Sequence, residues 1–265
     1  MTKISPLAFV NPEARIGNNV EIAPFAFIDA GVTIGDNCKI HPHVSICEGA
    51  ILGNGVEVFD GAVISADPQD FRWHGEQSNV IIGEKTVVRE HVIINRSIHH
   101  GEATRIGRKA FIMAQTHVGH DSEIGDKCVI GNAVKIAGDC KIGYGSILSS
   151  NALVHENCEV GELVLVKGGC RVNGNVPPFV IVAHNPISYA GINTFVLRKK
   201  GIDEAHIDDI AKCYRHIYQT NTSVGNAMRR ILEDVDKSEV RDKILSFIRN
   251  HNHKLVAIPE ELTID

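Results

Sequence analysis

Aromatic residues are scarce in this sequence: they make up 5% of its 265 residues and include a single Trp. A core built with so few rings must be filled by small branched side chains, and the 24 glycines indicate many tight turns. No run of 18 apolar residues is present, and the start, MTKISPLAFVNPEARIG, lacks the features of a signal peptide. We therefore expect a cytoplasmic protein without stable membrane insertion.

The sequence also lacks an excess of basic residues. Its net charge is −5 and its pI is about 6.3. Nucleic acids and anionic membranes attract proteins through positive charge, so neither is an expected partner.

What the sequence does have is a six-residue repeat, here called a hexad. From Ile4 to the hexad that opens at Val172, 26 hexads in one phase each begin with Ile, Val or Leu. A period of six fits neither a helix nor a hairpin meander, and it is typical of a solenoid of short parallel strands. Three hexads per coil, at about 4.8 Å per coil, predict a triangular prism roughly 40 Å long. Glycine recurs at the second hexad position, as at Gly107 and Gly125, where we expect corners with unusual backbone angles.

The seven cysteines form no CxxC motif. Five of them occupy the fifth hexad position, where Ala, Val or Ser stands in other hexads, and we expect them to be inward-facing, reduced side chains rather than metal ligands or disulfides. These five are Cys38, Cys128, Cys140, Cys158 and Cys170.

Two breaks interrupt the hexads without changing their phase. They predict loops at residues 66–81 and 100–105, inserted at corners of the prism. The first loop carries Trp73, which indicates either a functional loop or one that packs on its own aromatic ring. After residue 189 the apolar period becomes helical, with Asp203 as an expected N-cap. The predicted domains are therefore a β-helix at residues 1–189 and a small α-helical domain at residues 190–265, in which the chain turns helical from about Gly191.

Basic residues collect in the helical domain of this acidic protein. They indicate either an acidic partner or solvated helix faces. They are Arg198, Lys199, Lys200, Lys212, Arg215, Arg229 and Arg230.

His120 is the strongest catalytic candidate. It stands at a hexad position expected at a corner, with Asp121 directly after it and His117 three residues before it. Imidazole titrates near neutral pH, so a histidine oriented by a carboxylate can remove the proton from a sugar hydroxyl. Gly138 lies 18 residues further along, one coil away, where its N–H could bind an oxyanion.

Other interpretations of these histidines stay open. His117 and His120 could form a zinc pair, with His41, His43, His91 or His155 as further ligands. A third interpretation makes His120 an exposed structural residue. We predict that no metal and no other cofactor is used.

Several segments give the chain a resemblance to a known family. The segments are PQDFRWHGE, RIGRKAFIMAQTHVGHDSEIGDKC, VKGGCRVNGNVPPFVI and AGINTFVLRKKG. With the hexads, they resemble the UDP-N-acetylglucosamine O-acyltransferases of lipid A biosynthesis over essentially the full length. The resemblance implies an all-β left-handed parallel β-helix followed by a small C-terminal α-helical domain. It also implies a homotrimer with sites between prisms, and acyl carrier protein and a UDP-amino sugar as partners.

The resemblance also implies roles for individual residues. His120 matches the general base, Asp121 its orienting residue and Gly138 the oxyanion amide. The substrate-binding matches are Asp70, Arg72, His117, Asp139, His155, Glu156, Asn193, Arg198 and Lys199.

Some matched positions depart from the family pattern. Arg72 and Lys199 replace a lysine and an arginine, Asp139 replaces a histidine, and Glu156 replaces a glutamine. Phe195 replaces an acidic residue. Lys167 stands where glycine accompanies long acyl chains, so we expect a shorter or differently routed acyl chain.

The predicted function is transfer of a (3-hydroxy)acyl group from acyl carrier protein to the 3-hydroxyl of UDP-N-acetylglucosamine, the first step of lipid A biosynthesis. The alternatives are a paralogue that acylates a variant UDP-amino sugar, acylation of another nucleotide sugar from CoA, and a non-catalytic trimer that binds a nucleotide sugar.

Overall fold

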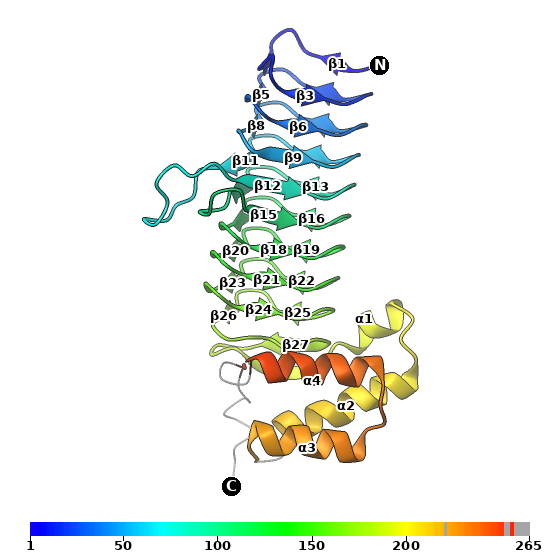
Figure 1. Cartoon of the computed structure of the whole chain (residues 1–265). Coiled ribbons are helices and arrows are strands. Elements are labelled where there is room, and N and C mark those ends of the chain that lie inside the picture. Colours follow the sequence, from blue (N-terminus) through cyan, green and yellow to red (C-terminus); the bar gives the residue numbers. More distant parts are fainter. Residues whose placement is uncertain (220–221, 252–254, 257–265) are drawn as a thin grey trace.

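The structure is a computed structural model, and it describes residues 1–219, 222–251 and 255–256. The helical prediction for residues 257–265 lies outside the described residues. Short strands stack into a triangular prism, and the helices gather at its C-terminal end (Figure 1). The fold class predicted from the sequence, a left-handed parallel β-helix followed by α-helices, is confirmed.

Each side of the prism is one sheet, and as far as β26 every third strand belongs to the same sheet; β27 and β28 extend sheet 1. Sheet 1 contains β1 (Lys3–Ile4), β4 (Glu21–Ile22), β7 (Lys39–Ile40), β10 (Glu57–Val58), β13 (Val87–Val88), β16 (Phe111–Ile112), β19 (Val129–Ile130), β22 (Ile147–Leu148), β25 (Leu165–Val166), β27 (Val180–Ala183) and β28 (Ser188–Ile192). Sheet 2 contains β2 (Phe9–Val10), β5 (Phe27–Ile28), β8 (Ser45–Ile46), β11 (Val63–Ala66), β14 (Ile93–Asn95), β17 (His117–Val118), β20 (Lys135–Ile136), β23 (Leu153–Val154) and β26 (Arg171–Val172). Sheet 3 contains β3 (Arg15–Ile16), β6 (Thr33–Ile34), β9 (Ala50–Leu52), β12 (Asn79–Ile82), β15 (Ala103–Ile106), β18 (Glu123–Ile124), β21 (Lys141–Ile142) and β24 (Glu159–Val160).

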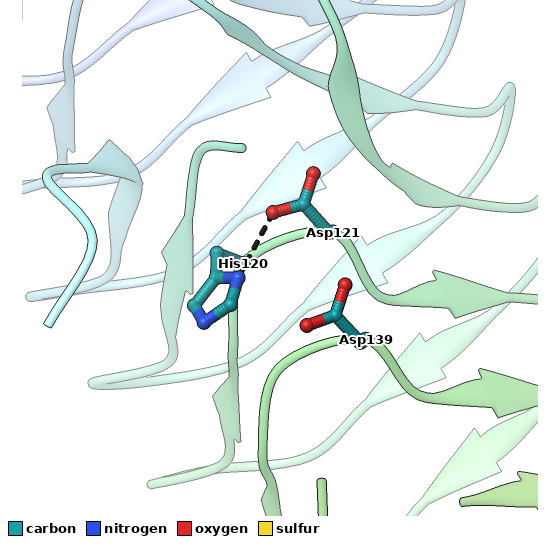
Figure 2. Close-up of side chains that lie close together, drawn as sticks. All are labelled: His120, Asp121 and Asp139. Carbon is teal, nitrogen blue, oxygen red and sulfur yellow. Dashed lines mark hydrogen bonds and ion pairs between the residues drawn. The ribbon is translucent and has the colours of Figure 1, made fainter. Parts of the chain in front are cut away.

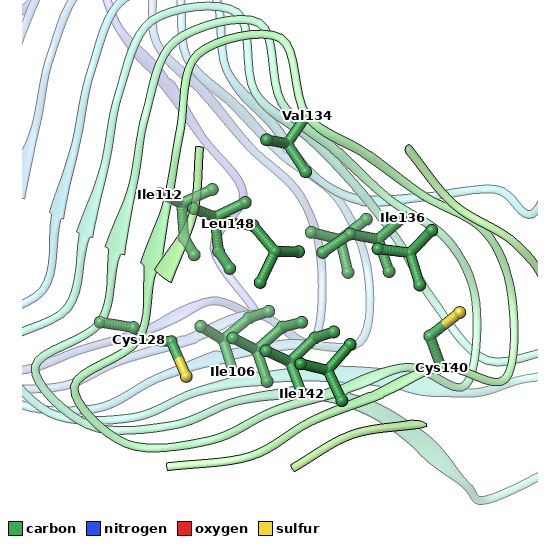
Figure 3. Packing of buried hydrophobic residues seen from close by; sticks show 14 of the residues in the cluster. Ile106, Ile112, Cys128, Val134, Ile136, Cys140, Ile142 and Leu148 are labelled. Atoms are coloured by element: carbon green, nitrogen blue, oxygen red, sulfur yellow. The ribbon is translucent and has the colours of Figure 1, made fainter. Parts of the chain in front are cut away.

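The first and fifth hexad positions fill the prism (Figure 3). Parallel pairing places equivalent residues 18 apart in register, as for Ile124 and Ile142, so each apolar column stacks along the axis. The five predicted inward cysteines are buried, and none of the seven cysteines forms a disulfide in the described part of the chain. The predicted inward position of these five cysteines is confirmed.

The expected role of glycine at the second hexad position is wrong. These glycines do not adopt left-handed angles; a Cβ on Gly107 would lie 2.5 Å from the backbone nitrogen of Asp126 in the next coil. Glycine is therefore required by the close approach of successive coils. The left-handed angles fall at the fourth position instead, for example at Asn37 and Lys127, with φ of 59° and 57°.

Four helices follow the prism: α1 (Thr194–Lys199), α2 (Glu204–Tyr218), α3 (Val224–Asp234) and α4 (Glu239–His251). As predicted, the Asp203 side chain caps α2 by accepting from the His206 N–H at 2.9 Å. The predicted helical start near Gly191 is wrong because β28 pairs antiparallel with β27 as far as Ile192, and α1 begins only at Thr194. No helix in the described ranges is long and apolar enough to cross a membrane.

Candidate active site

One corner of the prism carries both loops and His120. The first loop, residues 67–78, connects β11 to β12 and the second, residues 96–102, connects β14 to β15, so both pass from sheet 2 to sheet 3. The predicted bounds of 66–81 and 100–105 are wrong because Asn79–Ile82 and Ala103–Ile106 pair with each other as strands. His120 lies between β17 and β18, on the same corner. This shared corner is the candidate active site.

His120 is held between two carboxylates. Its Nδ1 lies 2.9 Å from Oδ2 of Asp121, and Figure 2 shows this contact. Its Nε2 lies 3.2 Å from Oδ2 of Asp70, which comes from the first loop. The side chain is buried, with 7% of the residue exposed. The imidazole therefore has one nitrogen fixed by its neighbour in sequence and the other directed at the loop.

Asp121 is itself firmly oriented. Its φ is 58°, and its N–H donates to Oγ1 of Thr104 at 2.8 Å. The Ser97 hydroxyl donates to Oδ1, and the Ile98 N–H donates to Oδ2 at 3.1 Å. Burial raises the pKa of Asp121, but the hydrogen bonds from Ser97, Ile98 and His120 outweigh it and lower the pKa below its usual value. The carboxylate thus stays ionised beside the imidazole.

Gly138 lies against the His120 ring, as its place one coil away predicts. A Cβ at Gly138 would lie 2.4 Å from both Cε1 and Nε2 of His120. The absence of a side chain therefore makes room for the imidazole. Within the described residues, the Gly138 N–H has no hydrogen-bond acceptor and is available to a ligand.

Arg72 joins three other predicted site residues into one cluster. Its backbone N–H and Nε donate to Oδ1 of Asp70 at 2.8 and 3.0 Å, and its Nη2 donates to Oδ2 at 2.8 Å. The same Nη2 lies 3.1 Å from Glu156 and 3.8 Å from Asp139. The hydrogen bonds from the Arg72 side chain and backbone hold the pKa of Asp70 well below its usual range. Arg72 thereby ties the first loop to the coils below His120.

His117 points outward from β17 on the same corner. Its Nε2 lies 2.7 Å from Oδ1 of Asn95, at the end of β14. Burial, with smaller effects from Lys135 and His120, lowers the pKa of His117 below its usual value. A neutral imidazole is therefore the favoured form near neutral pH.

Sequence reasoning missed the residues that orient these side chains. Asn95, Ser97 and Thr104 are buried, although their residue types are common on surfaces. Ser97 lies in the second loop and Thr104 lies on β15 just after it, and the loop's position was the only signal in the sequence that could have found them.

The described chain does not bring every predicted site residue to this corner. The exposed His155 shares the corner, and its side chain makes no hydrogen bond or ion pair among the described residues. Asn193 is buried at the corner between sheets 3 and 1, where its Nδ2 donates to the Leu163 carbonyl at 2.9 Å. Exposed Lys167 follows β25, at the corner between sheets 1 and 2. Arg198 pairs with Glu204 on α2, and Lys199 is exposed at the end of α1.

A cation could in principle lie near His120. One ligand atom each from His120, Asp121 and Asp139 lie within 4.8 Å of one another (Figure 2). However, His120 Nδ1 already contacts Asp121, and the second histidine of the alternative zinc pair uses its Nε2 on Asn95. The donors are therefore engaged with each other, an arrangement suited to proton transfer.

Comparison with known proteins identifies relatives along the whole chain. A family model for bacterial transferase hexapeptides, six repeats long, matches residues 103–138, and the model for domain 2 of UDP N-acetylglucosamine O-acyltransferase matches residues 175–256. An acyl-[acyl-carrier-protein]–UDP-N-acetylglucosamine O-acyltransferase of Chlorobaculum parvum is 44% identical, with 96% of each chain covered. A similarly named protein of Gloeothece citriformis is 36% identical over 67% of this chain. The chain spans only 64% of the length of that protein.

Solved structures agree with these matches. A UDP-N-acetylglucosamine acyltransferase from Bacteroides fragilis is 42% identical, with a TM-score of 0.93 over 97% of this chain and 100% of that one. The enzyme of the same name from Francisella novicida is 31% identical, with a TM-score of 0.94 over 99% of this chain and 96% of that one. Sequence and structure together confirm the predicted resemblance, and the chain belongs to the UDP-N-acetylglucosamine O-acyltransferase family.

Proposed function

We propose that this chain transfers a (3-hydroxy)acyl group from acyl carrier protein to the 3-hydroxyl of UDP-N-acetylglucosamine, the first step of lipid A biosynthesis. The observation that carries the proposal is the position of His120, with Asp121 on Nδ1 and the unused Gly138 N–H beside the ring. Family membership supplies the substrate classes, since the relatives are named for acyl carrier protein and UDP-N-acetylglucosamine.

In the proposed mechanism, the acceptor hydroxyl takes the place of the Asp70 carboxylate at His120 Nε2, now 3.2 Å away. Nε2 removes the hydroxyl proton while Asp121 stabilises the imidazolium that forms. The alkoxide attacks the thioester carbonyl, and the Gly138 N–H donates to the oxyanion. The intermediate collapses, the carbon–sulfur bond breaks, and the thiolate takes the proton back from His120.

The Arg72 cluster supports a role in acceptor binding. Asp70 contacts Nε2 and Arg72 contacts Asp70, so a sugar that displaces Asp70 meets hydrogen-bonding groups already in place. The carboxylates of Asp139 and Glu156 lie close to Arg72 and limit its freedom to move. We assign these residues to positioning the acceptor.

We also propose that the chain works as a homotrimer with sites between prisms. Sheet 1 presents an outward apolar column of Val87, Phe111, Val129, Ile147 and Leu165, which suits burial against a second copy. Asn193 and Lys167 lie at other corners than His120, and Arg198 and Lys199 lie on α1, so a neighbouring subunit would have to bring these residues to the site. A groove of about 790 Å³ lies along sheet 3 and α4 and does not include His120, in keeping with a cleft completed by another subunit.

The test is acyl transfer from a 3-hydroxyacyl carrier protein to UDP-N-acetylglucosamine by the purified chain. Turnover would support the proposal. Binding of UDP-N-acetylglucosamine without turnover would reject it and favour a variant amino sugar or a non-catalytic role, which a panel of acceptors would then separate.

A further inference from the structure

Asn95, which the mechanism above does not use, lies in a hydrogen-bond chain that ends at the candidate active site. It is the last residue of β14, and 1% of it is exposed. β11 and β14 pair through a register shift between Ile64 and Ala66, after which Ala66 lies opposite Asn95. The irregular end of β11 thereby brings backbone carbonyls to the buried Asn95 amide.

These carbonyls fix the orientation of the amide group. Asn95 Nδ2 donates to the Asp67 carbonyl at 2.6 Å and to the Ala66 carbonyl at 3.3 Å. In the reverse orientation Oδ1 would face two carbonyl oxygens, and a buried amide would lose both hydrogen bonds. Oδ1 therefore faces His117, and it lies 2.7 Å from Nε2 of that ring.

The fixed amide determines which nitrogen of His117 carries the proton. Oδ1 of Asn95 can only accept a hydrogen bond, so Nε2 of His117 must donate one. In a neutral imidazole the other nitrogen, Nδ1, then has a free lone pair. Among the described residues this Nδ1 has no hydrogen-bond partner, and it is open to solvent. The half-buried ring therefore offers an acceptor, not a donor, to a ligand.

The surroundings of His117 keep the ring neutral. Burial, followed by the charges of Lys135 and His120, lowers the pKa of His117. Lys135 lies opposite His117 on β20, and on the other side β14 contributes the uncharged Ile93 and Asn95. Within the described ranges no carboxylate forms an ion pair with His117, so nothing there favours the imidazolium.

We propose that Asn95 is a positioning residue of the reaction, which holds His117 as the Nε2–H tautomer so that Nδ1 accepts a hydrogen bond from the substrate. The proposal rests on the proposed function, because acyl transfer to a sugar brings O–H and N–H groups to this corner. The two histidines then have separate roles. His120 Nε2 removes a proton, whereas His117 Nδ1 accepts a hydrogen bond without taking the proton.

The first experiment measures the tautomer by NMR of the full chain labelled with [¹⁵N]histidine, and His117→Gln identifies the His117 signals. The wild type should show a protonated Nε2 and an unprotonated Nδ1 from about pH 6 to pH 8. Asn95→Ala should give averaged signals of the two tautomers, because the acceptor at Nε2 is lost. A protonated Nδ1 in the wild type, as tautomer or as imidazolium, would overturn the proposal.

The second experiment compares two replacements of His117 in acyl transfer. An asparagine side chain can place its amide oxygen near the position of Nδ1, whereas a glutamine side chain reaches the position of Nε2. His117→Asn should therefore keep a kcat/KM roughly tenfold above that of His117→Gln, since it restores the acceptor. Equal kcat/KM values for the two variants would contradict a role for Nδ1.

Asn95→Asp tests the positioning role through the pH profile. A carboxylate beside Nε2 favours the imidazolium, so kcat/KM should fall by roughly tenfold near neutral pH and recover as the pH rises. Asn132→Asp is the matched control and should stay within about twofold of the wild type. It adds the same charge at an exposed corner, where the Asn132 side chain makes no hydrogen bond among the described residues. An unchanged profile in Asn95→Asp would overturn the proposal.

Thermal unfolding of each variant checks that the fold is kept, and Asn95→Ala replaces Asn95→Asp if that variant unfolds. The NMR measurement needs no turnover. A wild type with the Nε2–H tautomer that transfers no acyl group would therefore reject the proposed function and leave Asn95 as the residue that fixes the tautomer of His117.

Discussion

His120 Nε2 lies 3.2 Å from Oδ2 of Asp70, although 50 residues separate them in the sequence. The nitrogen that must accept a proton is therefore already in contact with a carboxylate from the first loop. An acceptor hydroxyl that binds at Nε2 exchanges places with this carboxylate, and Asp70 remains close enough to bind a second hydroxyl of the sugar.

Asp70→Asn should consequently raise the KM for the acceptor by roughly tenfold with a smaller effect on kcat, because a charge-assisted hydrogen bond is lost. Steady-state kinetics with varied UDP-N-acetylglucosamine measures this. Asp67→Asn is the control, since Asp67 precedes Asp70 closely and pairs with Arg96 at 2.6 Å instead of His120. Equal KM values for the two variants would contradict the assignment of Asp70.

Gly138→Ala should lower kcat by about a hundredfold or more, because the new Cβ would stand 2.4 Å from the His120 ring and displace it from the oxyanion donor. Gly225→Ala is the control, because nothing lies within 4 Å of a Cβ there. Activity of Gly138→Ala near the wild-type level would show that the close contact has no catalytic importance.

Ser97→Ala should move the acidic limb of the pH–activity profile to higher pH. Burial raises the pKa of Asp121, and the hydrogen bond from the Ser97 hydroxyl contributes most among the hydrogen bonds that lower it, so removal of the hydroxyl raises that pKa. The stabilisation from ionised Asp121 is present above its unfolded pKa and is lost as the pH falls through its folded pKa, so acid unfolding should also begin at higher pH. Ser45→Ala serves as the control, because it removes a hydroxyl from β8 of sheet 2 that does not contact Asp121. An unchanged profile would contradict the role of Ser97.

The Lys167 side chain leads to a prediction about which acyl-chain length the enzyme prefers in its acyl donor. The hypothesis from the sequence is that its long side chain blocks the end of the acyl groove, so short-chain acyl carrier proteins should give the higher kcat/KM. Lys167→Gly should shift the optimum to longer chains, whereas Lys109→Gly, at another exposed lysine, should not. A clear wild-type preference for long chains would reject the hypothesis.

The regular part of the fold was predictable because a six-residue period repeats one local rule. The inward positions follow from it directly, as does the placement of Gly138 beside His120, since 18 residues make one coil. The function of glycine at the second position was not predictable, because it depends on the distance between coils; the 2.5 Å approach of a Gly107 Cβ to the next coil is a property of the assembled prism.

The contacts made by the loops could not be predicted either. The ion pair of Arg72 with Glu156 joins residues 84 apart, and it depends on how the first loop folds back over the corner. Ser97 and Asn95 carry no signal in their residue types; they became recognisable only when their hydrogen bonds to Asp121 and His117 were known. Asn193 and Lys167 lie at other corners, so their predicted roles require a second subunit.

The most direct test of the account is acyl transfer by His120→Ala compared with the wild type, using 3-hydroxyacyl carrier protein and UDP-N-acetylglucosamine. The account predicts that kcat falls by about 10²–10⁴-fold while the variant keeps its thermal unfolding temperature and its affinity for UDP, because only the proton acceptor is removed. A folded His120→Ala variant that turns over at the wild-type rate would contradict the assignment of His120 as the general base.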